Sequence, residues 1–190
     1  MSEVPGKRAS FRSFQESTRE DWDLIMSQIG KTQDMVADNA LHLLRALGDD
    51  HGGYPVSRLE HSLQTATRAE RDGRDEEYVV CALLHDIGDT LAPFNHPYIA
   101  STMVKPFASE ANHFMVAQHG IFQGYYFWHH IGLDRNSRDA FKDSPYYDYT
   151  EEFCAKYDSP AFDPDYGSAP LEHFEPLVRS FFADPRRRRA

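Results

Sequence analysis

The sequence predicts an all-α fold, and three observations support this expectation. Apolar residues recur at the three- and four-residue spacing of an amphipathic helix through most of the chain. The alternation of apolar and polar residues that is typical of a half-buried strand reaches no useful length. Glycines, prolines and short polar clusters separate the periodic segments, as turns separate helices. The pattern therefore predicts a helical bundle.

The N-terminal part of the chain is expected to contain an arm and two helices. Residues 1–18 mix Pro, Gly, Ser and Arg with Phe11 and Phe14, and we expect an arm that docks through these two rings. A first helix is predicted over residues 20–30, which end in a glycine, and a second over residues 32–48. Each places apolar side chains on one face at helical spacing.

The middle of the chain holds the most apolar helix that the sequence predicts. Residues 49–55 carry every turn signal and are expected to form a loop. Helices are predicted over 57–71 and 75–86, and the second of these is apolar on most of its surface. Two prolines bracket His96, which is therefore expected near the start of a fifth helix.

The C-terminal half is expected to be helical with one long loop. An aromatic run over residues 122–130 follows the sixth predicted helix. The expected segments are a helix over 109–119, a further helix capped by residues 134–138, a helix over 146–157, a loop rich in Pro, Asp and Gly over 159–170, and a last amphipathic helix over 170–183.

Length and charge narrow the functional classes. In this chain of 190 residues, we expect one domain over 19–184 and a solvated basic tail over 185–190. The net charge is −10, and it is −14 without the four arginines of the tail, which disfavours nucleic acid as a partner. No apolar run approaches the roughly 20 residues of a membrane span, and no secretory signal is found at the N-terminus. A cytoplasmic protein without a membrane partner is expected.

The clearest chemical signal lies at the end of the predicted helix over 75–86. A run of apolar residues leads directly into the adjacent pair His85 and Asp86, and Gly88 follows. Burying an imidazole and a carboxylate side by side is costly unless something pairs them. A metal ion does so economically, because it binds a neutral imidazole nitrogen and a carboxylate oxygen. We therefore predict that both residues are catalytic metal ligands.

Two further residues complete a recognisable order. His61 precedes the pair and Asp158 follows it at a distance, giving the pattern H…HD…D. This order resembles the HD-domain superfamily of helical metalloproteins over about residues 55–160. Glu60 is expected to orient His61 by accepting its other ring N–H. The resemblance implies a helical bundle with a metal centre in its core, held by His61, His85, Asp86 and Asp158.

Two more histidines lie between the HD pair and the distant aspartate. His96 and His119 exceed what one ion needs, so we expect a second ion. Asp86 can bridge both ions because a carboxylate has two oxygens. A cysteine cage for zinc is excluded, and imidazole with carboxylate suits iron or manganese. The second ion, with three protein ligands, leaves positions open for substrate and O2.

The sequence around these residues resembles the PhnZ-type branch of HD-domain oxygenases. That resemblance implies two iron ions in a mixed-valent Fe(II)/Fe(III) state, which use O2 to cleave the carbon–phosphorus bond of a 1-hydroxyphosphonate. In that branch a serine contacts the phosphonate, and Ser137, next to Arg138, resembles it. The matching segments are Leu59-Glu60-His61-Ser62-Leu63-Gln64, Ala82-Leu-Leu-His85-Asp86-Ile-Gly88, His96, His119 and Tyr157-Asp158.

Four positions depart from the pattern of the aminophosphonate enzymes in that branch. Asp89, Gln123 and Ala155 stand where those enzymes have His, Lys and Arg, although Lys156 lies next to the last of them. Tyr54 stands where they present an acidic residue to the substrate ammonium group. We expect Asp89, Gln123, Lys156 and Tyr54 to contact a substrate that differs from the simple aminophosphonate.

The loss of the acidic residue favours a substrate with a quaternary ammonium group. Such a group has no N–H to donate and is bound by aromatic faces. Tyr54, Tyr126 and Trp128 are candidates for this contact, although an aromatic run is also typical of core packing. These features resemble a related enzyme that converts (R)-1-hydroxy-2-(trimethylammonio)ethylphosphonate to glycine betaine and phosphate, and this reaction is the expected function.

Two other functions would use the same residues. A metal-dependent HD phosphohydrolase would activate water against a phosphate ester and would need neither O2 nor a redox couple. A binding module would hold a metal or a nucleotide without turnover. The complete set of six metal-ligating residues argues against the binding module, because a degenerate site is expected to lose ligands.

Overall fold

The computed structural model describes residues 6–49 and 52–183, and it confirms the all-α prediction, with no strand among these residues. The predicted tail over 185–190 lies outside the described residues. Short 3-10 helices join the longer elements at η1 (Phe14–Glu16), η2 (Pro93–Asn95), η3 (Trp128–Ile131) and η4 (Arg135–Phe141). The α-helices are α1 (Arg19–Asp34), α2 (Val36–Ala46), α3 (Arg58–Arg71), α4 (Glu76–Leu84), α5 (His96–Val104), α6 (Glu110–Phe127), α7 (Tyr147–Phe153) and α8 (Leu171–Ala183).

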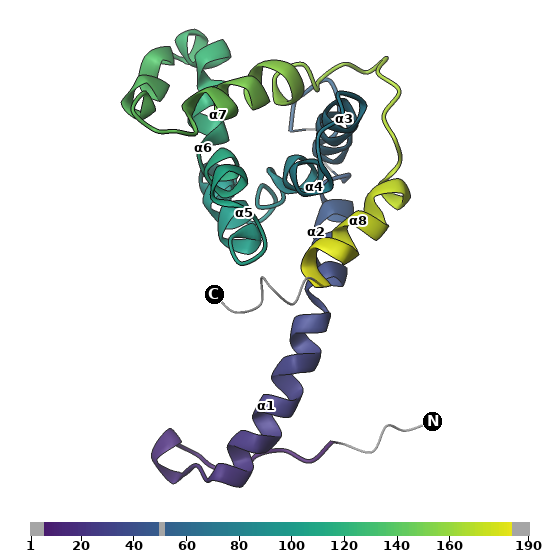
Figure 1. Cartoon of the computed structure of the whole chain (residues 1–190), viewed down its shortest axis with the longest axis vertical. Helices are drawn as coiled ribbons and strands as arrows, with labels where there is room; N and C mark the ends of the chain where they lie inside the picture. Colours follow the sequence, from purple (N-terminus) through teal and green to yellow (C-terminus); the bar gives the residue numbers. More distant parts are fainter. Residues whose placement is uncertain (1–5, 50–51, 184–190) are drawn as a thin grey trace.

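The core is built around α4, which packs against α3, α6 and α8 (Figure 1). Asp75 caps α4 by accepting a hydrogen bond from the backbone N–H of Tyr78. From Tyr78 to Leu84 every residue of the helix is buried, so the helix lacks a polar face. A helix that is apolar all round is stable only inside a protein, which explains its central position. The two residues that follow it therefore begin in the core.

Helix α1 projects away from this core (Figure 1), and its main packing partner is α2. The prediction that the first helix stops at Gly30 is wrong, because α1 continues to Asp34 and the break falls at Met35. A glycine within a helix costs only about 1 kcal/mol relative to alanine, so it does not by itself end the helix. The rings of Phe11 and Phe14 lie against Trp22, with centroids 6.4 and 5.8 Å away, which is how the N-terminal arm docks.

The sixth helix is longer than predicted. We expected it to end at His119, but α6 runs to Phe127 and includes residues 122–127 of the aromatic run. A glycine suits position 120 because α5 packs closely against α6 there. A Cβ added at Gly120 would lie 3.3 Å from the Pro97 ring. Ser109 caps the helix through the N–H of Asn112. The extension brings residues after His119 over the same face of the core.

A π-helical turn, η5 (Cys154–Asp158), follows α7 and ends at a predicted metal ligand. The N–H of Ser159 donates to the carbonyl of Cys154, five residues earlier. Single π turns are uncommon and occur often at functional sites. The hydroxyl of Tyr157 donates to Asp72 and accepts from Arg74, which anchors the turn to the end of α3. In the described part of the chain, we find no helix with the length and apolarity needed to span a membrane.

Candidate metal centre

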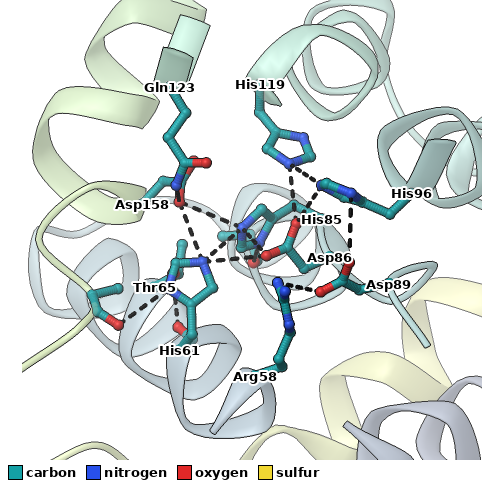
Figure 2. A network of polar contacts seen from close by, with 12 residues as sticks. Arg58, His61, Thr65, His85, Asp86, Asp89, His96, His119, Gln123 and Asp158 are labelled. Carbon is teal, nitrogen blue, oxygen red and sulfur yellow. Dashed lines mark hydrogen bonds and ion pairs between the residues drawn. The ribbon is translucent and has the colours of Figure 1, made fainter. Parts of the chain in front are cut away.

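Five different segments bring the predicted metal ligands to one place (Figure 2). His61 lies in the first turn of α3, and His85 and Asp86 follow α4 directly. His96 is the first residue of α5, His119 lies in the middle of α6, and Asp158 ends the π turn. The apolar character of α4 explains why the HD pair is buried, since the helix carries it into the core.

One half of the centre is made by His61, His85 and Asp158. The Nε2 atoms of the two histidines are 3.1 Å apart. They lie 3.2 Å and 3.6 Å from Oδ1 of Asp158. Oδ2 of Asp86 completes this half, at 3.4 Å from His61 Nε2 and 3.5 Å from His85 Nε2. These ligand atoms surround a space that one metal ion could take.

The other half of the centre is made by His96 and His119. Their Nε2 atoms are 3.2 Å apart and lie 3.0 Å and 3.1 Å from Oδ1 of Asp86. Asp86 thus turns one carboxylate oxygen toward each half, as a bridging ligand does (Figure 2). The arrangement offers two sets of ligand atoms that share a carboxylate.

The four histidines present the same ring nitrogen to the centre. In each ring Nδ1 donates to a backbone carbonyl: His61 to Ala161 at 3.1 Å, His85 to Ala82 at 2.7 Å, His96 to Pro93 at 2.6 Å and His119 to Val116 at 2.8 Å. A neutral imidazole that donates through Nδ1 keeps a lone pair on Nε2. Hydrogen bonds of this kind orient metal-ligating histidines and raise their basicity.

The electrostatics of the centre call for positive charge. Four Nε2 atoms and two buried carboxylates converge, and buried anions are costly without a cation. Burial acts to lower the pKa of His85, but the charges of Asp86 and Asp158 outweigh it and raise that pKa to about 9. Burial likewise opposes the shift at Asp158, yet hydrogen bonds from His61 and His85 lower its pKa. A proton or a metal ion can supply the missing charge, and the donor set suits a metal.

A protein-family model described as "HD domain" matches residues 58–142 of the chain. This range contains five of the six predicted ligands. This chain contains an HD domain. Asp158 lies beyond the matched range, and the π turn brings it to the other predicted ligands.

A curated relative supports the more specific resemblance over a short stretch. The chain is 50% identical over 46 residues to [1-hydroxy-2-(trimethylamino)ethyl]phosphonate dioxygenase (glycine-betaine-forming) of Leisingera caerulea. The match covers 24% of this chain and 24% of that protein.

Two of the predicted substrate contacts lie against predicted metal ligands. Gln123 donates from Nε2 to Oδ1 of Asp158 at 2.6 Å. Asp89 forms an ion pair with Arg58, and its Oδ1 lies 3.7 Å from Nδ1 of His96. Burial and the charge of Asp86 raise the pKa of Asp89, while Arg58 opposes that shift. Both side chains therefore lie at the centre.

The predicted phosphonate contacts around residues 137 and 156 are engaged elsewhere. The hydroxyl of Ser137 donates to the carbonyl of Asp134 at 2.8 Å. Arg138 is buried, pairs with Glu151 at 2.9 Å and lies 3.7 Å over the ring of Tyr125. Lys156 pairs with Glu152 and with Asp72, the C-cap of α3. His61 lies near the opposite, N-terminal end of that helix. Among the described contacts, none joins these three residues to a predicted ligand.

The aromatic candidates separate into two groups. Tyr54 stacks on Phe162 with centroids 5.3 Å apart, and Phe162 stacks on His61 at 4.3 Å. Tyr126 packs against the hydrophobic core, and the ring of Trp128 lies over Gly124. The contacts thus favour a place near the centre for Tyr54, core packing for Tyr126, and packing against Gly124 of α6 for Trp128.

One correction and two additions follow for the residues around His61. The prediction that Glu60 accepts its ring N–H is wrong, because the carbonyl of Ala161 occupies that position and Glu60 accepts from Gln64 and Ser168. Phe162 and Arg58 were not predicted. Arg58 lies three residues before His61 on α3, a spacing that could have placed it near the centre. Phe162 lies in an irregular loop and carries no comparable signal.

Proposed function

We propose that this HD domain binds two iron ions and uses O2 to cleave the carbon–phosphorus bond of a 1-hydroxyphosphonate. The observation that carries the proposal is the position of Asp86, whose two oxygens face separate sets of histidines. A site for a single ion would need only one of these two sets of histidines. His61, His85 and Asp158 would hold one ion, His96 and His119 the other, and Asp86 both, with Asp86 and His85 at the point where the two halves meet.

The donor set fits iron in both halves. Imidazole nitrogens and carboxylate oxygens suit iron, and the two cysteines, although buried, are not part of the six-residue set. When bound, the irons would supply the redox couple that activates O2 and the Lewis acidity that binds the substrate hydroxyl and phosphonate. The chain itself fixes the histidine tautomers, keeps Asp86 between the two halves, and excludes water from the buried half.

The proposed substrate is (R)-1-hydroxy-2-(trimethylammonio)ethylphosphonate, and the products are glycine betaine and phosphate. The short match to the Leisingera caerulea dioxygenase supports this choice. Tyr54 and Phe162 place two aromatic rings beside His61, although the faces of these rings already contact Arg58, each other and His61. A single HD domain over 19–184 and a cytoplasmic location belong to the same proposal.

The test compares the reaction with and without O2. Iron-loaded protein is expected to consume O2 and release phosphate from the trimethylammonio substrate, and to release none anaerobically. Mixed-valent iron should appear in the electron paramagnetic resonance spectrum of the partly oxidised protein. Phosphate release without O2 would contradict the oxygenase.

The second candidate is a metal-dependent phosphohydrolase, which the HD domain match also favours. The same two sets of ligands could activate water against a phosphate ester. Hydrolysis of p-nitrophenyl phosphate by the manganese-loaded protein, together with no O2 uptake on the hydroxyphosphonate, would favour this function. If the metal-loaded protein catalysed neither reaction, the binding module would be the remaining alternative.

A further inference from the structure

Arg58 places a guanidinium group at the edge of the centre. The residue lies in the first turn of α3, one turn before His61, and Figure 2 shows its side chain reaching Asp89 at the edge of the ligand cluster. Among the described ion pairs, it is the basic side chain whose partner also contacts a predicted ligand, since Oδ1 of Asp89 lies 3.7 Å from His96. Arg58 is therefore close to the half of the centre that His96 and His119 make.

Three contacts hold the head of Arg58 in place. Nη1 pairs with Asp89, whose side chain is 3% exposed. The guanidinium carbon lies 4.7 Å from the centre of the Tyr54 ring. A Cβ on Gly52 would lie 3.4 Å from Nη2, so the turn that contains Gly52 also packs against the group. A guanidinium group fixed in this way loses little further freedom when it binds a ligand.

The fixed group still has donors to offer. A guanidinium carries five N–H donors, and the ion pair with Asp89 occupies those on one side. The Arg58 side chain is 26% exposed, so part of it is accessible to a ligand. The other candidates for binding an anion, Arg138 and Lys156, are held in ion pairs away from the ligands.

We propose that Arg58 donates to an oxygen of the anionic phosphorus group of the substrate, and that Asp89 is a positioning residue for it. The inference rests on the proposed function and adds a residue that recognises the phosphonate end. Asp89 alone would repel an anion, but paired with Arg58 it orients the guanidinium fork, whose geometry matches a phosphonate or phosphate. Substrate would then lie between Arg58 and the half of the centre that contains His96.

The test measures binding of inorganic phosphate to the anaerobic iron-loaded protein by calorimetry. The double variant Arg58→Gln/Asp89→Asn removes both charges of the pair, so it leaves no unpaired buried carboxylate. We expect its dissociation constant for phosphate to rise roughly tenfold to a hundredfold, the range of charge-assisted hydrogen bonds. Asp89→Asn alone keeps the guanidinium charge but not its orientation, so it should bind phosphate more weakly than the parent and more tightly than the double variant. Arg45→Gln, which removes an exposed arginine on α2, is the matched control and should not change the constant.

Each outcome bears on the inference separately from the proposed function. A double variant that binds phosphate like the parent overturns it, as does an iron-loaded parent that binds no phosphate. If Arg58 controls phosphate binding but the parent shows no O2-dependent turnover, the inference stands and the oxygenase proposal fails.

If the double variant loses iron, Arg58→Lys is measured in its place, because lysine keeps the positive charge but lacks the forked guanidinium donors. Weaker phosphate binding at unchanged iron content supports the inference, and equal binding overturns it.

Discussion

The two halves of the metal centre share a carboxylate but differ in exposure. The side chains of His85 and Asp158 are fully buried, whereas that of His96 is 21% exposed. The buried half lies between α3, the end of α4 and the π turn, and the open half lies where α5 begins, next to Arg58 and Asp89. A closed set of ligands suits an ion that stays bound, and an open set leaves coordination positions for a ligand. The difference indicates that substrate approaches from the side of His96.

Removing the shared carboxylate should have the largest effect. Asp86→Ala is expected to abolish the coupled signal of the two irons and to lower turnover below about 1% of the parent, because both halves lose a ligand. Electron paramagnetic resonance and O2 uptake would measure these changes. Asp148→Ala, on the exposed face of α7, is the control and should keep both. A coupled signal in Asp86→Ala would show that Asp86 does not bridge.

Substitutions in the two halves should give different iron contents. His96→Ala is expected to keep about one ion, because the buried half retains all of its ligands, and to lose turnover. His61→Ala should lose iron from the buried half and bind the remaining ion more weakly. Iron analysis after gel filtration measures both. Equal losses in the two variants would contradict the distinction between a closed and an open half.

The buried half should also make iron binding depend on pH. In the metal-free protein the pKa of His85 is raised to about 9, so its imidazole holds a proton below that pH and must release it to bind a metal. Apparent iron affinity should therefore rise up to about pH 9 and then level off. The raised pKa also stabilises the metal-free fold at low pH, and this stabilisation should be lost as pH rises through about 9.

Calorimetry in buffers of different ionisation enthalpy would count the protons released, and thermal melting at several pH values would follow the stability of the metal-free protein. Iron binding without proton release at pH 7 would contradict the protonated state of His85. The metal-loaded protein is the control, because there the metal replaces the proton.

A smaller effect is expected from the residue that orients Asp158. Gln123→Leu removes the hydrogen bond to Oδ1 of Asp158 while keeping a side chain of similar length. Iron in the buried half should bind roughly tenfold more weakly, the lower end of the effect of groups that orient metal ligands. A competition titration with a chelator would measure it, with Gln28→Leu on α1 as the control. Unchanged iron affinity in Gln123→Leu would show that Asp158 does not depend on this contact.

The residues that gather at the candidate centre could be anticipated from sequence more readily than their surroundings. An apolar helix that ends in His85 and Asp86 predicts a buried polar pair, and the order of His61 and Asp158 around it supplied the resemblance. The contacts of Phe162 could not be predicted in the same way, because its loop has no periodicity and the stacking on His61 joins residues about a hundred positions apart.

Helix ends were harder to predict where only a glycine marked them. Both Gly30 and Gly120 lie inside helices, since neighbouring residues continue the helical pattern and a glycine lowers helix stability without ending it. Packing of Pro97 near Gly120 shows why a small residue is useful there. By contrast, the predicted starts of the helices over 57–71 and 75–86 agree with the structure, where Ser57 and Asp75 are the N-caps of α3 and α4.

The π turn at the end of α7 makes the centre sensitive to the number of residues in the chain as well as to their identity. The turn holds one residue more than an α-helical turn would, and Tyr157 and Asp158 rely on that extra residue to reach α3 and the metal ligands respectively. Deleting one residue from it would rotate the following side chains by about 100° around the helix axis. A related sequence with such a deletion could align at all six candidate ligand positions and still fail to bring Asp158 to the other five.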